Sequence, residues 1–158
     1  MKDIINLIDS YENFPKKGII FKDILGILKD PPMYKKLIHK MSKNKIIDDC
    51  DAILAIDARG FIFGSAISFY SSKPMIVTRK KGKLPGDLLE LDYDLEYGKN
   101  TLCIQKDSFR GYEKIAIVDD LIATGGTAKC VCDMLYDLKK SITGISVVVE
   151  LSKFDARS

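Results

Sequence analysis

The sequence has no tryptophan and a single histidine, and its four cysteines are scattered without a C-x-x-C pair. The cysteine spacing argues against a zinc site, and the single histidine, His39, argues against Ser-His or Cys-His catalysis. No apolar run approaches the ~20 residues that cross a bilayer, and the N-terminal residues lack a signal-peptide core. We therefore expect a cytoplasmic protein with reduced thiols.

A strong excess of charge is also missing. The 25 basic and 22 acidic side chains leave +3 over 158 residues, and 46% of the residues are hydrophobic. This composition suits a globular chain with a sizeable core, and the charge is too small to indicate nucleic-acid binding. No repeat or linker divides the sequence, so residues 1–158 are expected to form a single domain without nucleic-acid or membrane partners.

Short apolar segments alternate with helical patterns along the chain. Strands are predicted at 52–56, 75–78, 101–105, 115–118 and 145–151, and helices at 61–71 and 126–140. Two more helices are predicted near the N-terminus, one from Ile4 through Tyr11 and one opened by Pro32. Apolar strands between helices are typical of the α/β class, with a mostly parallel sheet flanked by helices.

Polar segments follow two of these strands, at 57–60 and at 119–127. Ligands of parallel sheets bind beyond the carboxyl ends of the strands, so both segments should open onto one crevice. The glycines and hydroxyls of Thr124–Thr127, at the start of a helix, can direct amide groups at a phosphate monoester.

Asp119 and Asp120 would repel that phosphate. Two adjacent carboxylates can instead accept hydrogen bonds from vicinal hydroxyls, such as those of a ribose, and can lie near Mg²⁺. The segment therefore predicts a ribose 5-phosphate site. The alternatives are a solvated acidic loop before a glycine-started helix, and a Walker A loop, whose motif is absent.

The segment 118–127, VDDLIATGGT, resembles the phosphoribosyl pyrophosphate signature of type I phosphoribosyltransferases. Four further segments resemble the adenine-specific branch of that family, and they occur in the family's order. They are FPKKGIIFKDI (14–24), DARGFIFG (57–64), RKKGKLPG (79–86) and LEYG (95–98). The resemblance implies that adenine and phosphoribosyl pyrophosphate react with Mg²⁺ to give AMP and pyrophosphate, in a homodimer.

The resemblance also implies a role for each matching residue. The 5′-phosphate would be held by Ala123, Thr124, Gly125, Gly126 and Thr127, and the ribose hydroxyls by Asp119 and Asp120. The pyrophosphate would be held by Ala58, Arg59 and Gly60, next to a cis Asp57–Ala58 peptide, and by Arg79, Lys80 and Lys83. Arg59 is also expected to serve catalysis.

The remaining implied roles concern the base and the lid. Adenine would contact Ile20, Phe21, Lys22 and Leu121, with base recognition in segment 14–24. Residues 79–98 read as a mobile lid without obvious secondary structure, in which Glu96 manages the proton of the purine and Tyr97 helps closure. The alternatives are an enzyme for hypoxanthine, guanine or orotate, and a regulator that senses phosphoribosyl pyrophosphate and binds DNA.

Overall fold

The computed structural model of the chain describes residues 2–95 and 98–151. The chain divides into two compact units, residues 1–40 and 41–158, which are taken separately below. That all 158 residues act as one domain stays a prediction.

The first unit is built on a two-stranded antiparallel hairpin. After the short helix α1 (Lys2–Ile5), strand β1 (Asp9–Glu12) pairs with β2 (Ile20–Asp23). The predicted helix through Tyr11 is therefore wrong, because Tyr11 lies in β1 directly opposite Phe21. Pairing between residues ten apart overrides the local helical spacing, which carries no information about a distant partner strand.

The helix predicted after Pro32 is confirmed. A 3-10 turn, η1 (Leu25–Lys29), leads into α2 (Pro31–Ser42). Asp30 caps this helix, since its Oδ1 accepts a hydrogen bond of 3.0 Å from the amide of Met33. His39 is exposed on α2, as the polar sequence around it indicates.

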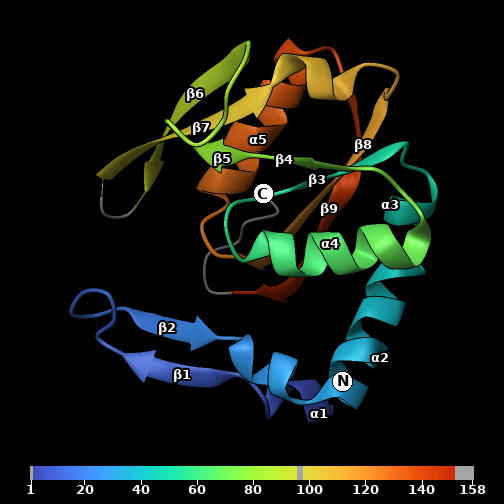
Figure 1. Cartoon of the computed structure of the whole chain (residues 1–158). Coiled ribbons are helices and arrows are strands. Elements are labelled where there is room, and N and C mark those ends of the chain that lie inside the picture. The colour runs from blue at the N-terminus through green and yellow to red at the C-terminus, as the bar shows by residue number, and fades with distance from the viewer. Residues whose placement is uncertain (1, 96–97, 152–158) are drawn as a thin grey trace. The chain divides into compact units, whose positions relative to one another are not determined.

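The second unit contains a four-stranded parallel sheet in the order β4-β3-β8-β9 (Figure 1). The strands are β3 (Ala52–Ala55), β4 (Met75–Val77), β8 (Lys114–Ile122) and β9 (Ser141–Glu150). All three pairings are parallel, which confirms the predicted α/β class. The four apolar segments predicted here as strands all belong to this sheet.

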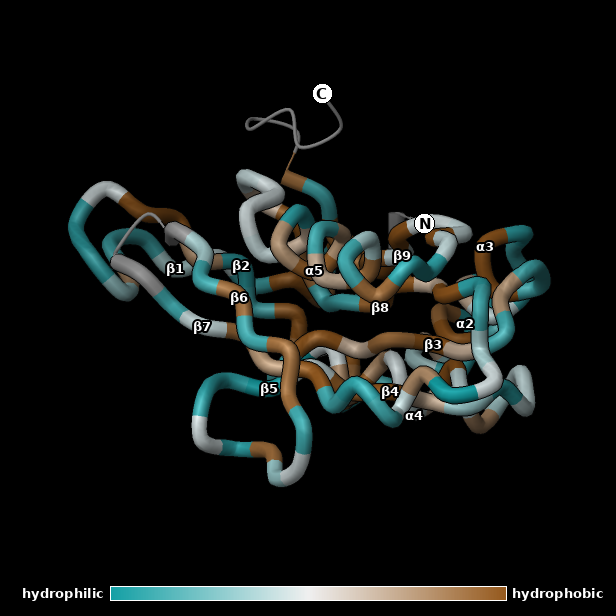
Figure 2. The backbone as a smooth tube through the Cα atoms, turned by 90° about the horizontal axis from the view of Figure 1, so that it is seen from above, coloured by the Kyte–Doolittle hydropathy of each residue, from teal (hydrophilic) through white to brown (hydrophobic). Residues whose placement is uncertain are grey.

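Helices cover both faces of the sheet: α4 (Gly60–Ser71) on one side and α5 (Gly126–Asp137) on the other (Figure 2). Successive side chains of β3 point to opposite faces of the sheet. Leu54 belongs to the core cluster that includes Val131 and Leu135 of α5. Ala55 points the other way, where a Cβ added to Gly64 of α4 would lie 2.6 Å from its own. Gly64 thus lets α4 pack directly on β3.

A second sheet follows β4 in the chain. Strands β5 (Arg79–Lys80), β6 (Leu88–Leu95) and β7 (Gly98–Gln105) form an antiparallel sheet in the order β5-β7-β6, followed by η2 (Lys106–Phe109). The prediction that 79–98 lacks secondary structure is therefore wrong. Leu89, Leu91 and Tyr93 of β6 pack against the core cluster that includes α5, so one face of this sheet is held by apolar contacts. We call residues 79–105 the hood.

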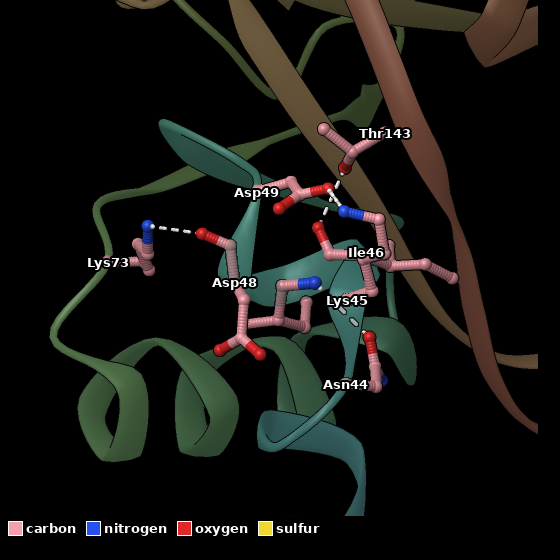
Figure 3. A network of polar contacts seen from close by, with 8 residues as sticks. Asn44, Lys45, Ile46, Asp48, Asp49, Lys73 and Thr143 are labelled. Atoms are coloured by element: carbon pink, nitrogen blue, oxygen red, sulfur yellow. Dashed lines mark hydrogen bonds and ion pairs between the residues drawn. The ribbon is translucent and has the colours of Figure 1, made fainter.

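The amino end of the sheet is fixed by a polar network around α3 (Lys45–Asp48), shown in Figure 3. Asn44 caps α3 through an Oδ1 that accepts a hydrogen bond of 3.2 Å from the amide of Ile47. Lys73, just before β4, donates to the carbonyls of Asp48 and Cys50, and Thr143 of β9 donates to that of Ile46. These contacts tie α3 to the start of β4 and to β9.

Every helix within residues 2–95 and 98–151 falls short of the length and hydrophobicity that a membrane crossing requires.

Candidate functional site

The acidic pair lies within strand β8 and not beyond it. The sequence predicts a strand ending at Val118, but β8 continues to Ile122 because Asp119 pairs with Val147 and Leu121 with Val149 of β9. Alternation along the strand then separates the two carboxylates. Asp119 lines a pocket on the α5 side, whereas Asp120 is only 5% exposed and faces Arg59.

A pocket of ≈ 190 Å³ lies where β8 turns into α5. Gly125 precedes the helix with φ +82°, a left-handed conformation that glycine adopts without a steric penalty. The helix N-terminus of α5 therefore opens directly onto the pocket, which suits an anion. Predicted site residues that line it are Asp119, Leu121, Ala123, Thr124, Gly125, Gly126 and Thr127.

Burial raises the pKa of Asp119 well above its usual range, and the negative charge of Asp120 raises it further. The amide of Asp120 donates a 2.8 Å hydrogen bond to Asp119 Oδ1, and this bond lowers the pKa. The positive charge of Arg59 lowers it as well, but these two effects do not offset the increase caused by burial. Without a ligand, this carboxyl group therefore retains its proton to a higher pH than an exposed aspartate.

The second polar segment begins after β3, at the same end of the sheet. Its Asp57–Ala58 peptide is cis, which confirms the expectation from the sequence. Arg59 Nε lies 2.9 Å from Asp120 Oδ2, so an ion pair joins this segment to β8. Gly60 begins α4, and a Cβ added there would lie 2.8 Å from Asp119 Oδ1. The two polar segments therefore lie in contact at this end of the sheet. That both open onto one crevice stays a prediction, because the residues that line the pocket include none of 57–60.

Four cations lie at the start of the hood, in residues 79–83, and their contacts differ. Arg79 lies beside the polar segment that follows β3, with Nε 3.1 Å from Asp57 Oδ2. Lys81 instead pairs with Glu90 of the neighbouring strand β6, at 2.7 Å. Lys80 and Lys83 are exposed. Arg79 is thus held through its side chain at Asp57, directly before Ala58, Arg59 and Gly60, whereas Lys80 contacts Asp57 through its backbone amide.

Tyr93 is a residue that the sequence analysis missed. Its side chain hydrogen-bonds the side chain of Thr127 at the start of α5, and burial raises its pKa. The missed signal is the alternation of apolar and polar residues in LELDYDL, 89–95, which predicts a strand with Tyr93 on its inner face. The hydroxyl group of Tyr93 thus connects the hood to the turn that lines the pocket.

The other predicted residues are not brought to this pocket by any described contact. Ile20, Phe21 and Lys22 belong to strand β2 of the first unit, where Lys22 Nζ donates a 2.7 Å hydrogen bond to Ser10 Oγ across the hairpin. Glu96 and Tyr97 fall outside the described residues, so the acid-base and closure roles stay predictions.

Comparison with known proteins agrees with this geometry. No protein-family model matches the chain. An adenine phosphoribosyltransferase of Prochlorococcus marinus (strain MIT 9312) is 52% identical over 158 residues, covering 100% of this chain and 93% of the relative.

Two solved structures of the same enzyme type are also similar. That from Thermoanaerobacter pseudethanolicus aligns with a TM-score of 0.91 at 37% identity, covering 99% of this chain and 91% of the other. That from Saccharomyces cerevisiae, complexed with adenine and an imino-altritol bisphosphate, has a TM-score of 0.85 at 31% identity and covers 99% and 91%. The chain therefore belongs to the adenine phosphoribosyltransferase family, whose enzymes salvage purines by making AMP.

Proposed function

We propose that the pocket at the end of β8 binds the ribose 5-phosphate part of phosphoribosyl pyrophosphate, and that the chain transfers this group to adenine. The observation that carries the proposal is the arrangement of hydrogen-bond acceptors and donors within one pocket. The carboxylate of Asp119 stands at one side, and the glycine turn and α5 N-terminus stand at the other. That order suits a sugar with vicinal hydroxyls at one end and a phosphate ester at the other.

The phosphate end would be bound by main-chain amides of 123–127 and the hydroxyl groups of Thr124 and Thr127. Hydrogen bonds from such groups to an ionised phosphate each contribute about 1.5–3 kcal/mol, and the α5 dipole adds to them. The described residues that line the pocket include no basic side chain, so main-chain amides and threonine hydroxyls are proposed to supply this binding.

The ribose hydroxyls would donate to Asp119 first. Asp120 stays proposed as the second acceptor, but it is buried and paired with Arg59. Its carboxylate could therefore accept from the sugar only when Arg59 turns toward the pyrophosphate. Sugar binding and the reorientation of Arg59 are thus expected to occur together. The negative charges below the ring would also favour an oxocarbenium-like transition state.

The pyrophosphate leaving group would lie against Ala58, Arg59 and Gly60, with Arg79, Lys80 and Lys83 contributing positive charge. Among the described residues, no group of three or more His, Cys, Asp or Glu side chains could hold a metal ion. A Mg²⁺ ion would therefore take most of its ligands from the pyrophosphate and water, which is its usual preference. When bound, Mg²⁺ supplies charge neutralisation of the leaving group.

Adenine would be recognised by Ile20, Phe21 and Lys22, with Leu121 against the ring. The proposal is supported by the yeast relative, whose structure holds adenine together with a sugar bisphosphate analogue. Glu96 would manage the proton that the purine loses on attack, and Tyr97 would help the hood close.

A homodimer is the proposed assembly, and α4 supplies the support for it. This helix reads GFIFGSAISFYS, with no charged residue, and its Phe69 side chain is 90% exposed and Tyr70 42%. A helix that is apolar on every side is normally covered on every side. We propose that a second copy of the chain packs against the exposed side of α4. The cytoplasmic location stays a prediction from the sequence.

The proposed function is tested with a substrate panel. Adenine, hypoxanthine, guanine and orotate are each incubated with phosphoribosyl pyrophosphate and Mg²⁺, and pyrophosphate release is followed. We expect turnover with adenine and at least 100-fold lower kcat/KM with the other bases, because a site that hydrogen-bonds one base leaves polar groups unpaired with another. Release with hypoxanthine or guanine at the adenine rate would contradict the proposal. DNA binding without turnover would favour the regulator.

A further inference from the structure

Asp57 is a carboxylate where an anion is expected to bind. It follows β3 and precedes the segment 58–60, and its side chain is only 10% exposed. A buried negative charge here would repel pyrophosphate unless it is neutralised. The described contacts of its carboxylate supply that neutralisation, and both come from the start of the hood.

Arg79 is the first partner. Its Nε donates to Asp57 Oδ2 at 3.1 Å, and its guanidinium carbon lies 5.7 Å from the centre of the Phe61 ring. The guanidinium is therefore held both by a carboxylate and by an aromatic ring of α4. The hydrogen bond to the carboxylate is made by Nε, the donor nearest the side-chain stem.

The backbone of the hood supplies the second partner. The amide of Lys80 donates to the same Asp57 oxygen at 3.3 Å. Arg79 and Lys80 form strand β5, which pairs with Cys103 and Leu102 of β7. One carboxylate oxygen thus anchors both the side chain of Arg79 and the strand that carries it.

We propose that Asp57 is a positioning residue for pyrophosphate binding: it holds Arg79 at the segment 58–60 before the substrate arrives. A free arginine loses rotamer freedom when it binds a ligand, whereas a held one has already lost it. Asp57 thereby converts a flexible cation into a fixed one. The inference rests on the proposed function, in which Arg79 is a pyrophosphate ligand.

The test compares pyrophosphate affinity in a double-mutant cycle. The wild type, Asp57→Asn, Arg79→Gln and the double variant are titrated with inorganic pyrophosphate and Mg²⁺ by calorimetry. We expect Asp57→Asn to weaken binding about tenfold, and to weaken it no further in the Arg79→Gln background. Equal losses from Asp57→Asn in both backgrounds would overturn the inference, because Asp57 would then not act through Arg79.

The matched control is Asp107→Asn. Asp107 of η2 forms an Asp–Arg ion pair with Arg110, which follows η2, at the same 3.1 Å, but both side chains are 84% exposed. This variant should bind pyrophosphate as the wild type does. A loss equal to that of Asp57→Asn would contradict a specific role for Asp57.

Steady-state kinetics separate positioning from a general structural defect. In Asp57→Asn, the KM for phosphoribosyl pyrophosphate should rise about tenfold while the KM for adenine stays within a factor of two. A rise in both KM values would count against the inference. Calorimetry needs no adenine turnover, so a wild type that binds pyrophosphate without turning over adenine contradicts the proposed function, while the cycle still decides the role of Asp57.

Discussion

Asp119 and Asp120 are like charges on adjacent residues of one strand, and Arg59 forms an ion pair with Asp120. Asp119 instead accepts the amide of Asp120 and faces the pocket. Its environment is poor for a carboxylate until hydroxyl groups of a ligand arrive. The sequence predicts the pair and its purpose, but it cannot predict this asymmetry, which arises when the strand sends neighbouring side chains to opposite faces.

Replacing Asp119 by Asn should therefore stabilise the free protein. Because the pKa of Asp119 is raised in the folded state, the folded state binds more protons than the unfolded state above about pH 4, so stability falls as pH rises toward the raised pKa. Asp119→Asn removes this loss. We expect a melting temperature about 2–5 °C above the wild type at pH 8, and no gain at pH 4, measured by calorimetry.

The same variant should weaken ribose 5-phosphate binding about tenfold, because an amide is a poorer acceptor than a carboxylate. Asp133→Asn is the control, since Asp133 lies on α5 in an exposed pair with Lys129. It should alter neither property. An Asp119→Asn protein that melts at or below the wild-type temperature at pH 8 would show that burial of this charge is not costly.

At the scale of elements, the sequence predicts the central strands well and the hood poorly. Strand β3 is apolar and fully buried, β8 carries a buried apolar run, and β4 and β9 carry apolar runs that are partly buried, so their composition identifies them. Strand β6 alternates acidic residues with Leu89, Leu91 and Tyr93, and acidic residues have low strand propensity. Its partner β7 and the α5 helix stabilise it, and neither contact can be seen in the local sequence.

The turn before α5 carries a prediction of its own. Gly125 and Gly111 both have positive φ values, +82° and +86°, so Gly→Ala at either position should cost about 1–2 kcal/mol of stability. Only Gly125 lines the pocket, and nothing lies within 4 Å of a Cβ at Gly111. Gly125→Ala should therefore weaken ribose 5-phosphate binding at least tenfold, while Gly111→Ala should not. Isothermal titration of both variants decides between these outcomes.

If both variants bind ribose 5-phosphate equally well, the amides of this turn do not contact the phosphate. If both bind it equally poorly, the loss follows from general destabilisation. Thermal melts recorded beside each titration keep these two results apart.

At the scale of the whole molecule, the parallel sheet follows from the alternation of apolar strands with helices. The order β4-β3-β8-β9 does not, because strand order depends on packing between helices far apart in the chain. The same limit applies to assembly. The apolar face of α4 is visible in the sequence as an uncharged helix, yet its 90% exposed Phe69 is a fact of the structure.

Phe69→Lys should convert a dimer into a monomer if α4 forms the interface. Burying an unpaired lysine costs several kcal/mol, which exceeds what most single interface contacts contribute. Tyr136→Lys is the matched control, because Tyr136 is an aromatic residue 65% exposed on α5. Sedimentation equilibrium should give half the wild-type mass for Phe69→Lys only. An unchanged mass would remove α4 from the interface.

The absence of a side chain at Gly60 has one more consequence. A methyl group there would press on Asp119 Oδ1 at 2.8 Å and on the carbonyl of Val118 at 3.1 Å. Gly60, proposed to bind the leaving group, thus packs directly against Val118 and Asp119, next to the residues proposed to bind the sugar. A substitution that moves the backbone at Gly60 will therefore also displace Asp119, so the affinities for the pyrophosphate and for the ribose are expected to change together.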